Sequence, residues 1–230
     1  MTKMVDPFMN LRLQAIKKLL PQEDYLTVCD IGCGKGIFTK ACVEIFFNSQ
    51  IVGMDIDIKK IKDAQSGIPS ASLFIANGTN IPIKSASCDL VLCLEVIEHQ
   101  KNAEYLLKEI YRILKPGGVL LVSTPNMHSL TALTGKITYF LVRTKFLAFD
   151  KTHINLYHPK KLLCELSTFQ FNNFDLHGIW IFPIGASHPS VLRKLIKSTI
   201  ILNFMSKSYR NSILVEMAFI TVVICKKGSE

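Results

Sequence analysis

Residues 28–36 read VCDIGCGKG, an apolar run that ends in Asp30 and opens into Gly32, Gly34 and Gly36, each separated by one residue. Glycine lets a ligand approach the backbone closely, and a turn before a helix presents free N–H groups to that ligand. A dinucleotide-binding turn has the spacing G-x-G-x-x-G, which differs from the spacing here. The acid two residues before the first glycine would repel a pyrophosphate but attract an ammonium group. The stretch therefore predicts a strand, a ligand-binding turn and a helix.

Outward from this stretch, apolar runs that look like strands alternate with helical patterns up to residue 126. The strand-like runs are YLTVCDI, QIVGMD, SLFIA, CDLVLCL and GGVLLVS. Such alternation predicts crossover units and a parallel sheet that helices cover on both faces. We expect KPGG at 115–118 to form a helix stop and a turn. Farther on, the pattern predicts helices, including one over roughly 185–210, and a closing pair of strands in NFDLHGIWIF and LVEMAFITVVICKK.

The composition is that of a folded domain, with 49% hydrophobic and 20% charged residues in a chain of 230. Such a chain can bury a large core as a single domain over residues 1–230 and is not typical of disorder. The 7 cysteines are odd in number and are never spaced as Cys-x-x-Cys, which predicts reduced thiols in a cytoplasmic protein. The opening residues predict an amphipathic helix and no signal peptide. Because charged residues interrupt every long apolar stretch, no transmembrane span is predicted.

The formal net charge of +9 is unevenly distributed, because residues 127–230 hold 13 of the 27 Lys and Arg but only 5 of the 18 Asp and Glu. A basic half predicts an acidic partner. Its basic segments are interleaved with aliphatic residues more than with aromatic ones, which favours peripheral contact with an anionic membrane over RNA. The alternative is a basic surface that meets only solvent.

A second acidic position follows the next strand-like run, in VGMDID at 52–57. Asp55 would end that strand at the same sheet edge as the glycine turn. An acid there can accept hydrogen bonds from both ribose hydroxyls of an adenosine group. Asp57, two residues farther on, predicts a helix N-cap.

Four motifs, in order, are VCDIGCGKG, IVGMD, NGTNIPIKSASCDLVLCLEVIEH and LKPGGVLLVSTPN, which span residues 28–126. With them the chain resembles the class I S-adenosylmethionine-dependent methyltransferases of the type 11/12 kind, and its EVIEH segment is similar to that of ubiquinone-pathway enzymes. The resemblance implies an α/β, Rossmann-like fold with helices on both faces of a seven-stranded, mainly parallel sheet of order 3-2-1-4-5-7-6. It also implies a cofactor-binding half, 1–126, and a substrate-facing half, 127–230, whose helical insertions cover the acceptor site.

The same resemblance implies S-adenosylmethionine as the cofactor. The residues that it places around this cofactor are Asp30, Gly32 and Gly34 at the methionine end, Asp55 at the ribose, Ile56 against the adenine and Asn77 near the adenine amino group. Many relatives carry an aspartate at the position of Asn77. The amide oxygen of Asn77 could accept the same hydrogen bond.

Residues 92–100 read LCLEVIEHQ, in which Glu95, Glu98 and His99 follow a strand-like run. If a helix begins there, spacings of three and four residues place all three side chains on one helical face. That face would lie at the carboxyl edge of the sheet, where open α/β folds bind ligands. These are the candidate catalytic residues. His99 could act as the base that deprotonates an oxygen nucleophile.

The spacing Glu-x-x-Glu-His also resembles the divalent-metal site of small-RNA 2′-O-methyltransferases and of ubiquinone-pathway O-methyltransferases. This resemblance implies Glu95, Glu98, His99 and a fourth ligand, His153, around Mg²⁺, Mn²⁺ or Zn²⁺. Two alternatives stay open. The cluster could have a metal-free polar or basic role, or it could be a plain helix start that the helix dipole favours.

The predicted function is methyl transfer to an oxygen of a small-molecule or lipid-linked acceptor. Basic helical segments beyond residue 126 would form a lid over an apolar acceptor, or would simply pack on the core. A metal-assisted RNA 2′-O-methyltransferase and a non-catalytic scaffold of the same fold are the alternatives. The intact glycine turn and Asp55 favour the enzyme.

Overall fold

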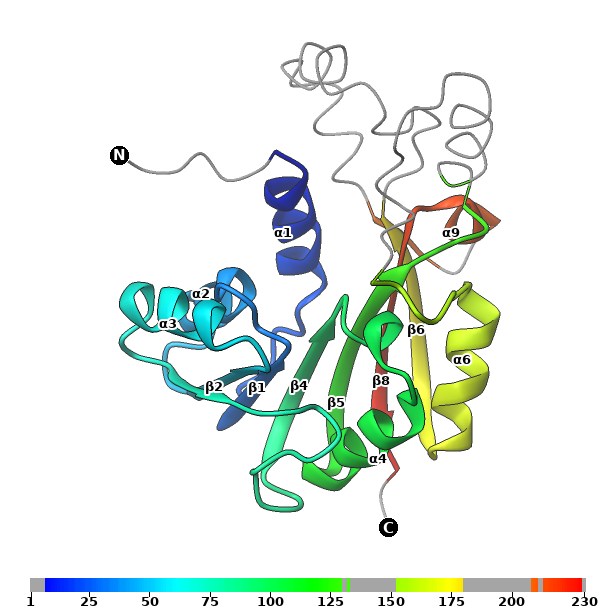
Figure 1. The fold of residues 1–230 in the computed structure, drawn as a ribbon. Helices are drawn as coiled ribbons and strands as arrows, with labels where there is room; N and C mark the ends of the chain where they lie inside the picture. Colours follow the sequence, from blue (N-terminus) through cyan, green and yellow to red (C-terminus); the bar gives the residue numbers. More distant parts are fainter. Residues whose placement is uncertain (1–6, 130–131, 133–151, 180–207, 211–212, 229–230) are drawn as a thin grey trace.

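The computed structural model describes residues 7–129, 132, 152–179, 208–210 and 213–228 (Figure 1). Within this part, the strands form one sheet of order β3-β2-β1-β4-β5-β8-β6-β7. The strands are β1 (Thr27–Ile31), β2 (Gln50–Asp55), β3 (Ser72–Ile75), β4 (Cys88–Leu94), β5 (Leu114–Pro125), β6 (Phe171–Ile179), β7 (Ser208–Arg210) and β8 (Ile220–Lys227).

The pairing of the strands confirms the predicted sheet order. Neighbours among β1 to β5 are parallel, whereas β8 runs antiparallel to both β5 and β6. Strand β8 therefore takes the place of the predicted seventh strand. The short β7 pairs with the outer side of β6 and adds an eighth strand that the prediction did not contain.

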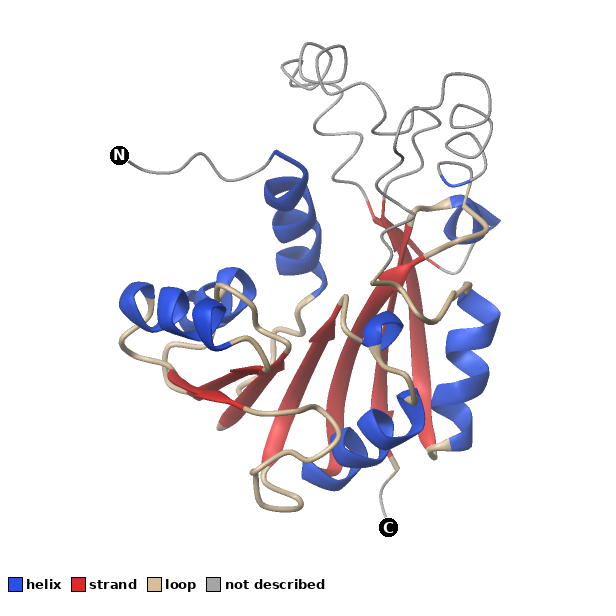
Figure 2. Cartoon of the chain, in the orientation of Figure 1, coloured by secondary structure: helices blue, strands red, loops and turns tan. Residues whose placement is uncertain are grey.

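Helices cover both faces of the sheet (Figure 2). The helices of the described part are α1 (Pro7–Leu19), α2 (Ile37–Ile45), α3 (Ile58–Gly67), η1 (Ile97–His99), α4 (Ala103–Ile113), α6 (Pro159–Thr168) and α9 (Ile213–Met217). Side chains of α1 and α2 pack with Val119 and Leu121 of β5 in one core cluster, and those of α4 and α6 pack with Leu120 and Val122 in another. Because successive side chains of a strand point to opposite faces, each central strand supplies both clusters.

Local sequence explains where the helices begin. Asp57 caps α3, since its Oδ1 accepts from the N–H groups of Lys59 and Lys60, as predicted. Asn102 caps α4 by accepting from the N–H of Glu104. Pro159 occupies the first turn of α6, where its missing N–H is not needed.

Three local predictions are corrected by the structure. Helix α4 ends at Ile113 as expected, but KPGG is part of β5 and not a separate turn, because a register shift beside Cys88 and the positive φ of Gly117 (74°) let the strand continue. Residues 208–210, predicted as helix, form β7. The segment LVEM, predicted as strand, belongs to α9.

Of the other helices predicted beyond residue 126, one is confirmed as α6, and the rest fall largely on positions 133–151 and 185–207, outside the described residues. Among the helices that the structure describes, none has the length and apolar character needed to cross a membrane.

Candidate active site

The glycine turn joins β1 to α2 with Gly32, Gly34 and Gly36 all at positive φ (70°, 56° and 78°). A Cβ at Gly32 would lie 2.3 Å from Cγ2 of Val96, so this position is closed by packing. A Cβ at Gly34 would meet nothing nearer than Oδ2 of Asp55, at 4.0 Å. The backbone at Gly34 therefore borders open space, in which a ligand can approach the chain.

Asp55, at the end of β2, holds the turn in place. Its Oδ2 accepts from the N–H of Gly34 and its Oδ1 from the N–H of Asp57, both at 2.9 Å. The side chain is nearly buried, yet it lines the adjoining cavity. A carboxylate fixed in this way can still accept further hydrogen bonds, because each oxygen has two lone pairs.

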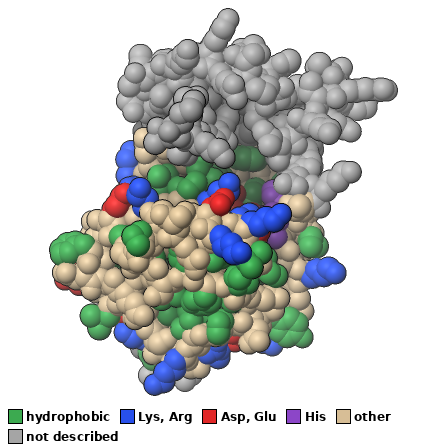
Figure 3. Space-filling model, turned by 60° about the vertical axis from the view of Figure 1, so that its left-hand side comes forward, with side chains coloured by type: hydrophobic (Ala, Val, Ile, Leu, Met, Phe, Trp, Pro, Cys, Tyr) green, Lys and Arg blue, Asp and Glu red, His purple; other side chains and the backbone are tan. Residues whose placement is uncertain are grey.

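The cavity has a volume of about 800 Å³ and lies at the carboxyl ends of β1, β2, β3 and β4. The predicted site residues that line it are Gly32, Gly34, Asp55, Ile56, Asn77, Glu95 and His99. In Figure 3, basic, acidic and histidine side chains lie near one another across the middle of the view. The sheet edge predicted for ligand binding thus carries a hollow that most of the predicted side chains share.

Asp30 lies apart from the cavity wall, only 2% exposed. The hydroxyl of Thr39 donates to its Oδ2 at 2.5 Å. Burial raises the pKa of Asp30 to about 7, against the lowering effect of the Thr39 hydrogen bond. Any effect of Asp30 on a ligand in the cavity would pass through the field of its charge or through the glycine turn.

The chain leaves β4 through Glu95, which has a positive φ of 57°, and enters the short 3₁₀ turn η1. The prediction that Glu95, Glu98 and His99 share one helical face is therefore wrong, since α4 begins only at Ala103. The left-handed backbone at Glu95 interrupts the helical geometry on which that prediction depended.

The two carboxylates of this turn have different surroundings. Glu95 accepts from the hydroxyl of Ser123 at 3.0 Å and pairs with Arg12 of α1 at 3.2 Å. Glu98 is 2% exposed, its Oε2 accepts from the hydroxyl of Thr124 at 3.2 Å, and its Oε1 has no hydrogen-bond partner. Burial, and then the neighbouring Glu95, raise the pKa of Glu98 to about 9.

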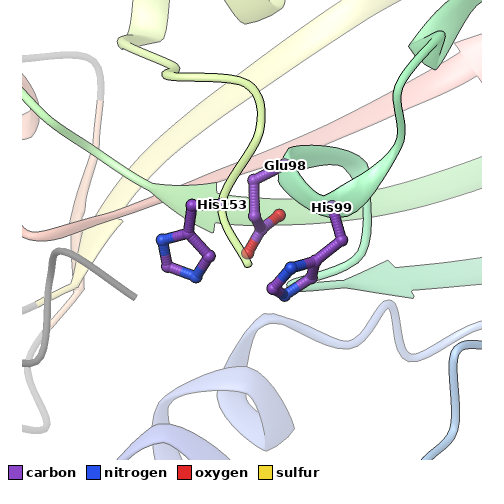
Figure 4. A group of neighbouring side chains, drawn as sticks. All are labelled: Glu98, His99 and His153. Atoms are coloured by element: carbon purple, nitrogen blue, oxygen red, sulfur yellow. The ribbon is translucent and has the colours of Figure 1, made fainter. Parts of the chain in front are cut away.

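Two histidines meet beside Glu98 (Figure 4). The rings of His99 and His153 have centroids 4.9 Å apart. Nδ1 of His99 lies 3.0 Å from the carbonyl oxygen of Thr152, and the carbonyl of Glu98 accepts from the N–H groups of Ile154 and Asn155. These bonds dock the segment 152–155, which carries His153, against η1.

Glu98, His99 and His153 each offer one ligand atom, and these atoms lie within 4.8 Å of one another. Among the described residues, the structure thus brings together three of the four predicted metal ligands. Glu95, the remaining one, is not in this group; its carboxylate instead contacts Arg12 and Ser123.

Sequence reasoning missed Arg12. Its guanidinium pairs with Glu95, lies over the ring of Phe38 with the centroid 5.4 Å away, and has a buried Nε without a hydrogen-bond partner. A single arginine in an amphipathic helix carries no signal of such a role, since arginines usually lie on the solvent face. Ser123 and Thr124 were missed because they directly follow the apolar run VLLV of β5 and have no spacing pattern of their own.

A methyltransferase-domain family model matches residues 8–176. The chain belongs to the class I S-adenosylmethionine-dependent methyltransferases. It is similar to a probable S-adenosylmethionine-dependent methyltransferase of Mycolicibacterium smegmatis, 32% identical over 170 residues, which cover 70% of this chain and 59% of the relative. It is also similar to the ubiquinone biosynthesis O-methyltransferase of Idiomarina loihiensis, 28% identical over 162 residues, which cover 68% of this chain and 66% of the relative. The chain thus matches only about three fifths to two thirds of the length of these two relatives.

Solved methyltransferase structures share the fold. A Thermotoga maritima S-adenosylmethionine-dependent methyltransferase, described as a possible histamine N-methyltransferase, has a TM-score of 0.69 at 22% identity, covering 96% of this chain and 92% of that one. The phosphoethanolamine N-methyltransferase 2 of Haemonchus contortus, solved with S-adenosylhomocysteine, has a TM-score of 0.66 at 17% identity. The match covers 96% of this chain and 53% of that one. At these identities the likeness extends to the fold alone.

Proposed function

We propose that this methyltransferase transfers a methyl group from S-adenosylmethionine to an oxygen of a small-molecule or lipid-linked acceptor. The observation that carries the proposal is the open backbone at Gly34 beside the carboxylate of Asp55, in the wall of the cavity. When bound, the cofactor supplies an electrophilic methyl group on a sulfonium.

The residues around the cavity fit this cofactor. Gly34 leaves the space that a side chain would fill, and Asp55 retains lone pairs for ribose hydroxyls. Ile56 is 70% exposed and offers an apolar surface to an adenine ring. The Oδ1 of Asn77 accepts from the N–H of Thr79 and has a second lone pair for an amino group.

His99 supports an oxygen acceptor, because a hydroxyl must lose its proton on methylation. A carbonyl oxygen only accepts, so the contact with Thr152 places the proton of a neutral His99 on Nδ1. Nε2 is then left as the proton acceptor, on a side chain that lines the cavity. Relatives named as O-methyltransferases of ubiquinone biosynthesis and of malonyl-[acyl-carrier protein] agree with an oxygen acceptor of this kind.

A metal-assisted form of the same reaction is favoured by the group of Glu98, His99 and His153. One carboxylate and two imidazoles form a donor set that suits Zn²⁺ or Mn²⁺, and the unpartnered Oε1 of Glu98 is a ligand atom without a present use. A cation held there would lower the pKa of an acceptor hydroxyl. His99 would then serve as a ligand and not as the base.

Calorimetry with S-adenosylhomocysteine, the demethylated product, tests the cofactor assignment. Gly34→Val and Asp55→Ala should abolish measurable binding, because valine fills the approach to the backbone and alanine cannot hold the ribose. Gly117→Val is the matched control, since Gly117 has a similar φ of 74° and open surroundings in a different part of the fold. Binding that survives in both site variants would contradict the assignment.

Calorimetry with Zn²⁺ and Mn²⁺ tests the metal-assisted form. His153→Ala and Glu98→Gln should each weaken binding by about tenfold or more, because each removes one ligand. His128→Ala, which changes an exposed histidine outside the group, should leave cation binding unchanged. An unmodified protein that binds neither cation would leave His99 as the base.

Mass spectrometry of a cell lysate incubated with the protein and an isotope-labelled methyl donor identifies the acceptor. Label on a small molecule or lipid supports the proposal. Label on RNA would favour the RNA alternative, and no label in any fraction, despite product binding, would favour the non-catalytic scaffold.

A further inference from the structure

The carboxyl end of β5 carries two adjacent hydroxyl side chains, Ser123 and Thr124, that are 1% and 0% exposed. Along β5, Leu121 belongs to the core cluster of α1 and α2, whereas Val122 belongs to that of α4 and α6. Because side chains alternate along a strand, Ser123 points to the α1 face and Thr124 to the α4 face. The two hydroxyls therefore act on opposite sides of the sheet.

Ser123 holds Glu95. Its hydroxyl donates to Oε1 at 3.0 Å, and its carbonyl accepts from the N–H of Glu95, also at 3.0 Å. Arg12, from α1, pairs with Oε2. A left-handed backbone is costly for a residue with a side chain and persists only where its surroundings hold it, and Ser123 supplies two of the contacts that do so here.

Thr124 holds Glu98. Its hydroxyl donates to Oε2, and Oε1 is left without a partner. In Figure 4 the carboxylate of Glu98 lies between the rings of His99 and His153. With one oxygen bound to Thr124, the carboxylate has little freedom to rotate, so the orientation of Glu98 toward the two rings depends on this hydroxyl.

We propose that Ser123 and Thr124 are positioning residues that separate the roles of the two carboxylates. Ser123 keeps Glu95 in the wall of the cofactor cavity, and Thr124 keeps Glu98 against the two histidines at the place of reaction. This inference rests on the proposed function. It does not depend on whether a metal binds, because the orientation of Glu98 matters in either form of the reaction.

Isosteric variants separate the two roles. Thr124→Val removes the hydroxyl and keeps the shape, Thr124→Ser restores the hydroxyl, and Ser123→Ala tests the other carboxylate. Thr221→Val is the matched control, because Thr221 pairs with Thr124 in the sheet register, is equally buried, and has a hydroxyl without a hydrogen-bond partner. Each variant is measured for S-adenosylhomocysteine affinity by calorimetry and for the imidazole NMR signals of His99 and His153, assigned with His99→Gln and His153→Gln.

Ser123→Ala should weaken product binding by about three- to tenfold, a loss within the range for one ordinary hydrogen bond, and should leave both imidazole signals in place. Thr124→Val should shift these signals and change product affinity by less than about twofold. Thr124→Ser should restore the original signals, and Thr221→Val should alter neither measurement.

The proposal is overturned if Ser123→Ala and Thr124→Val change the same measurement, or if Thr221→Val shifts the imidazole signals as Thr124→Val does. Product binding by the unmodified protein is the separate check on the proposed function. If it fails, the cofactor assignment and the role of Ser123 fall together, whereas the imidazole signals still decide the role of Thr124.

Discussion

Asp30 and Asp55 lie near the ends of neighbouring strands, β1 and β2, but their carboxylates differ in burial and in hydrogen-bond donors. Asp55 accepts from two backbone N–H groups beside the cavity. Asp30 accepts from Thr39 alone, through its hydroxyl and its backbone, and is almost completely buried. An ionised carboxylate with so few donors is unfavourable in the interior. Burial accordingly raises the pKa of Asp30 to about 7.

We predict that Asp30→Asn reduces the pH dependence of folding stability. The raised pKa means that the folded state binds a proton more tightly than the unfolded chain, whose pKa is near 3.8. The protonated Asp30 therefore contributes its full stabilisation of the folded state below about pH 4, and this contribution is lost as the pH rises through 7. Each unit of pKa difference between the folded and unfolded states corresponds to about 1.4 kcal/mol, so the free energy of unfolding falls by a few kcal/mol at most. Asparagine stays neutral and can still accept from Thr39.

Urea unfolding of both proteins at pH 5 and pH 8 measures this effect. The variant should gain stability relative to the unmodified protein at the higher pH. A stability difference that is the same at both pH values would contradict the raised pKa.

At the scale of elements, α4 determines where the loop after β3 lies. Arg112 donates to the carbonyls of Ile81 and Ile83 and pairs with Glu109, which itself accepts from the N–H of Ile81. The same loop contains Asn77, which lines the cavity. Side-chain contacts from α4 thus replace the backbone ladder that the loop lacks.

Arg112→Met should lower the free energy of unfolding by about 1–3 kcal/mol, because it leaves the two carbonyls and Glu109 without their donor. Product affinity should fall as well, since the loop carries Asn77 into the cavity. Lys108→Met is the matched control on the same helix. It removes an exposed ion pair with Glu104, so its effect on stability should stay below about 0.5 kcal/mol. Equal losses from both variants, measured by urea unfolding, would rule out this role for Arg112.

At the scale of the whole molecule, the net positive charge is concentrated in the second half of the sequence. Residues 127–230 contain 13 of the 27 basic residues and 5 of the 18 acidic ones. Of these basic residues, the structure describes Lys160, Lys161 and Arg210 among others, each paired with an acid. The excess of positive charge therefore falls largely on residues outside the described part.

We predict that the protein associates with anionic vesicles and that salt weakens this association, because exposed electrostatic contacts are screened as ionic strength rises. Sedimentation with phosphatidylserine-containing vesicles, and with neutral vesicles as the control, measures it. Equal binding to both kinds, or binding to neither, would leave the basic residues as a solvated surface.

Periodic local patterns were sufficient to predict most of the fold. Val, Ile and Leu in short runs, alternating with helical stretches, predicted the parallel core, and the family resemblance implied the order of its strands; the pairing confirms both. The errors fall where local preference competes with sheet pairing. KPGG contains two strong turn residues, yet its backbone is part of β5, and residues 208–210 pair with β6 although they were predicted to be helical.

The sequence by itself determined which of the predicted residues meet at the cavity. The carboxyl ends of parallel strands meet at one edge of a sheet, and at or just after such an end lie Gly32, Gly34, Asp55, Ile56 and Asn77. Their meeting therefore follows from local order and strand direction alone. The resemblance to a known family was visible for the same reason, because its motifs are continuous in the sequence.

Only the tertiary structure decided how the two glutamates are used. Arg12 reaches Glu95 from α1, while Ser123 and Thr124 reach the two carboxylates from opposite faces of β5. No local pattern encodes such contacts, because they depend on how distant elements pack and on the left-handed backbone at Glu95. Three residues predicted to be equivalent on one helical face were thereby divided, since packing left Glu98 and His99 beside His153 and turned Glu95 toward Arg12.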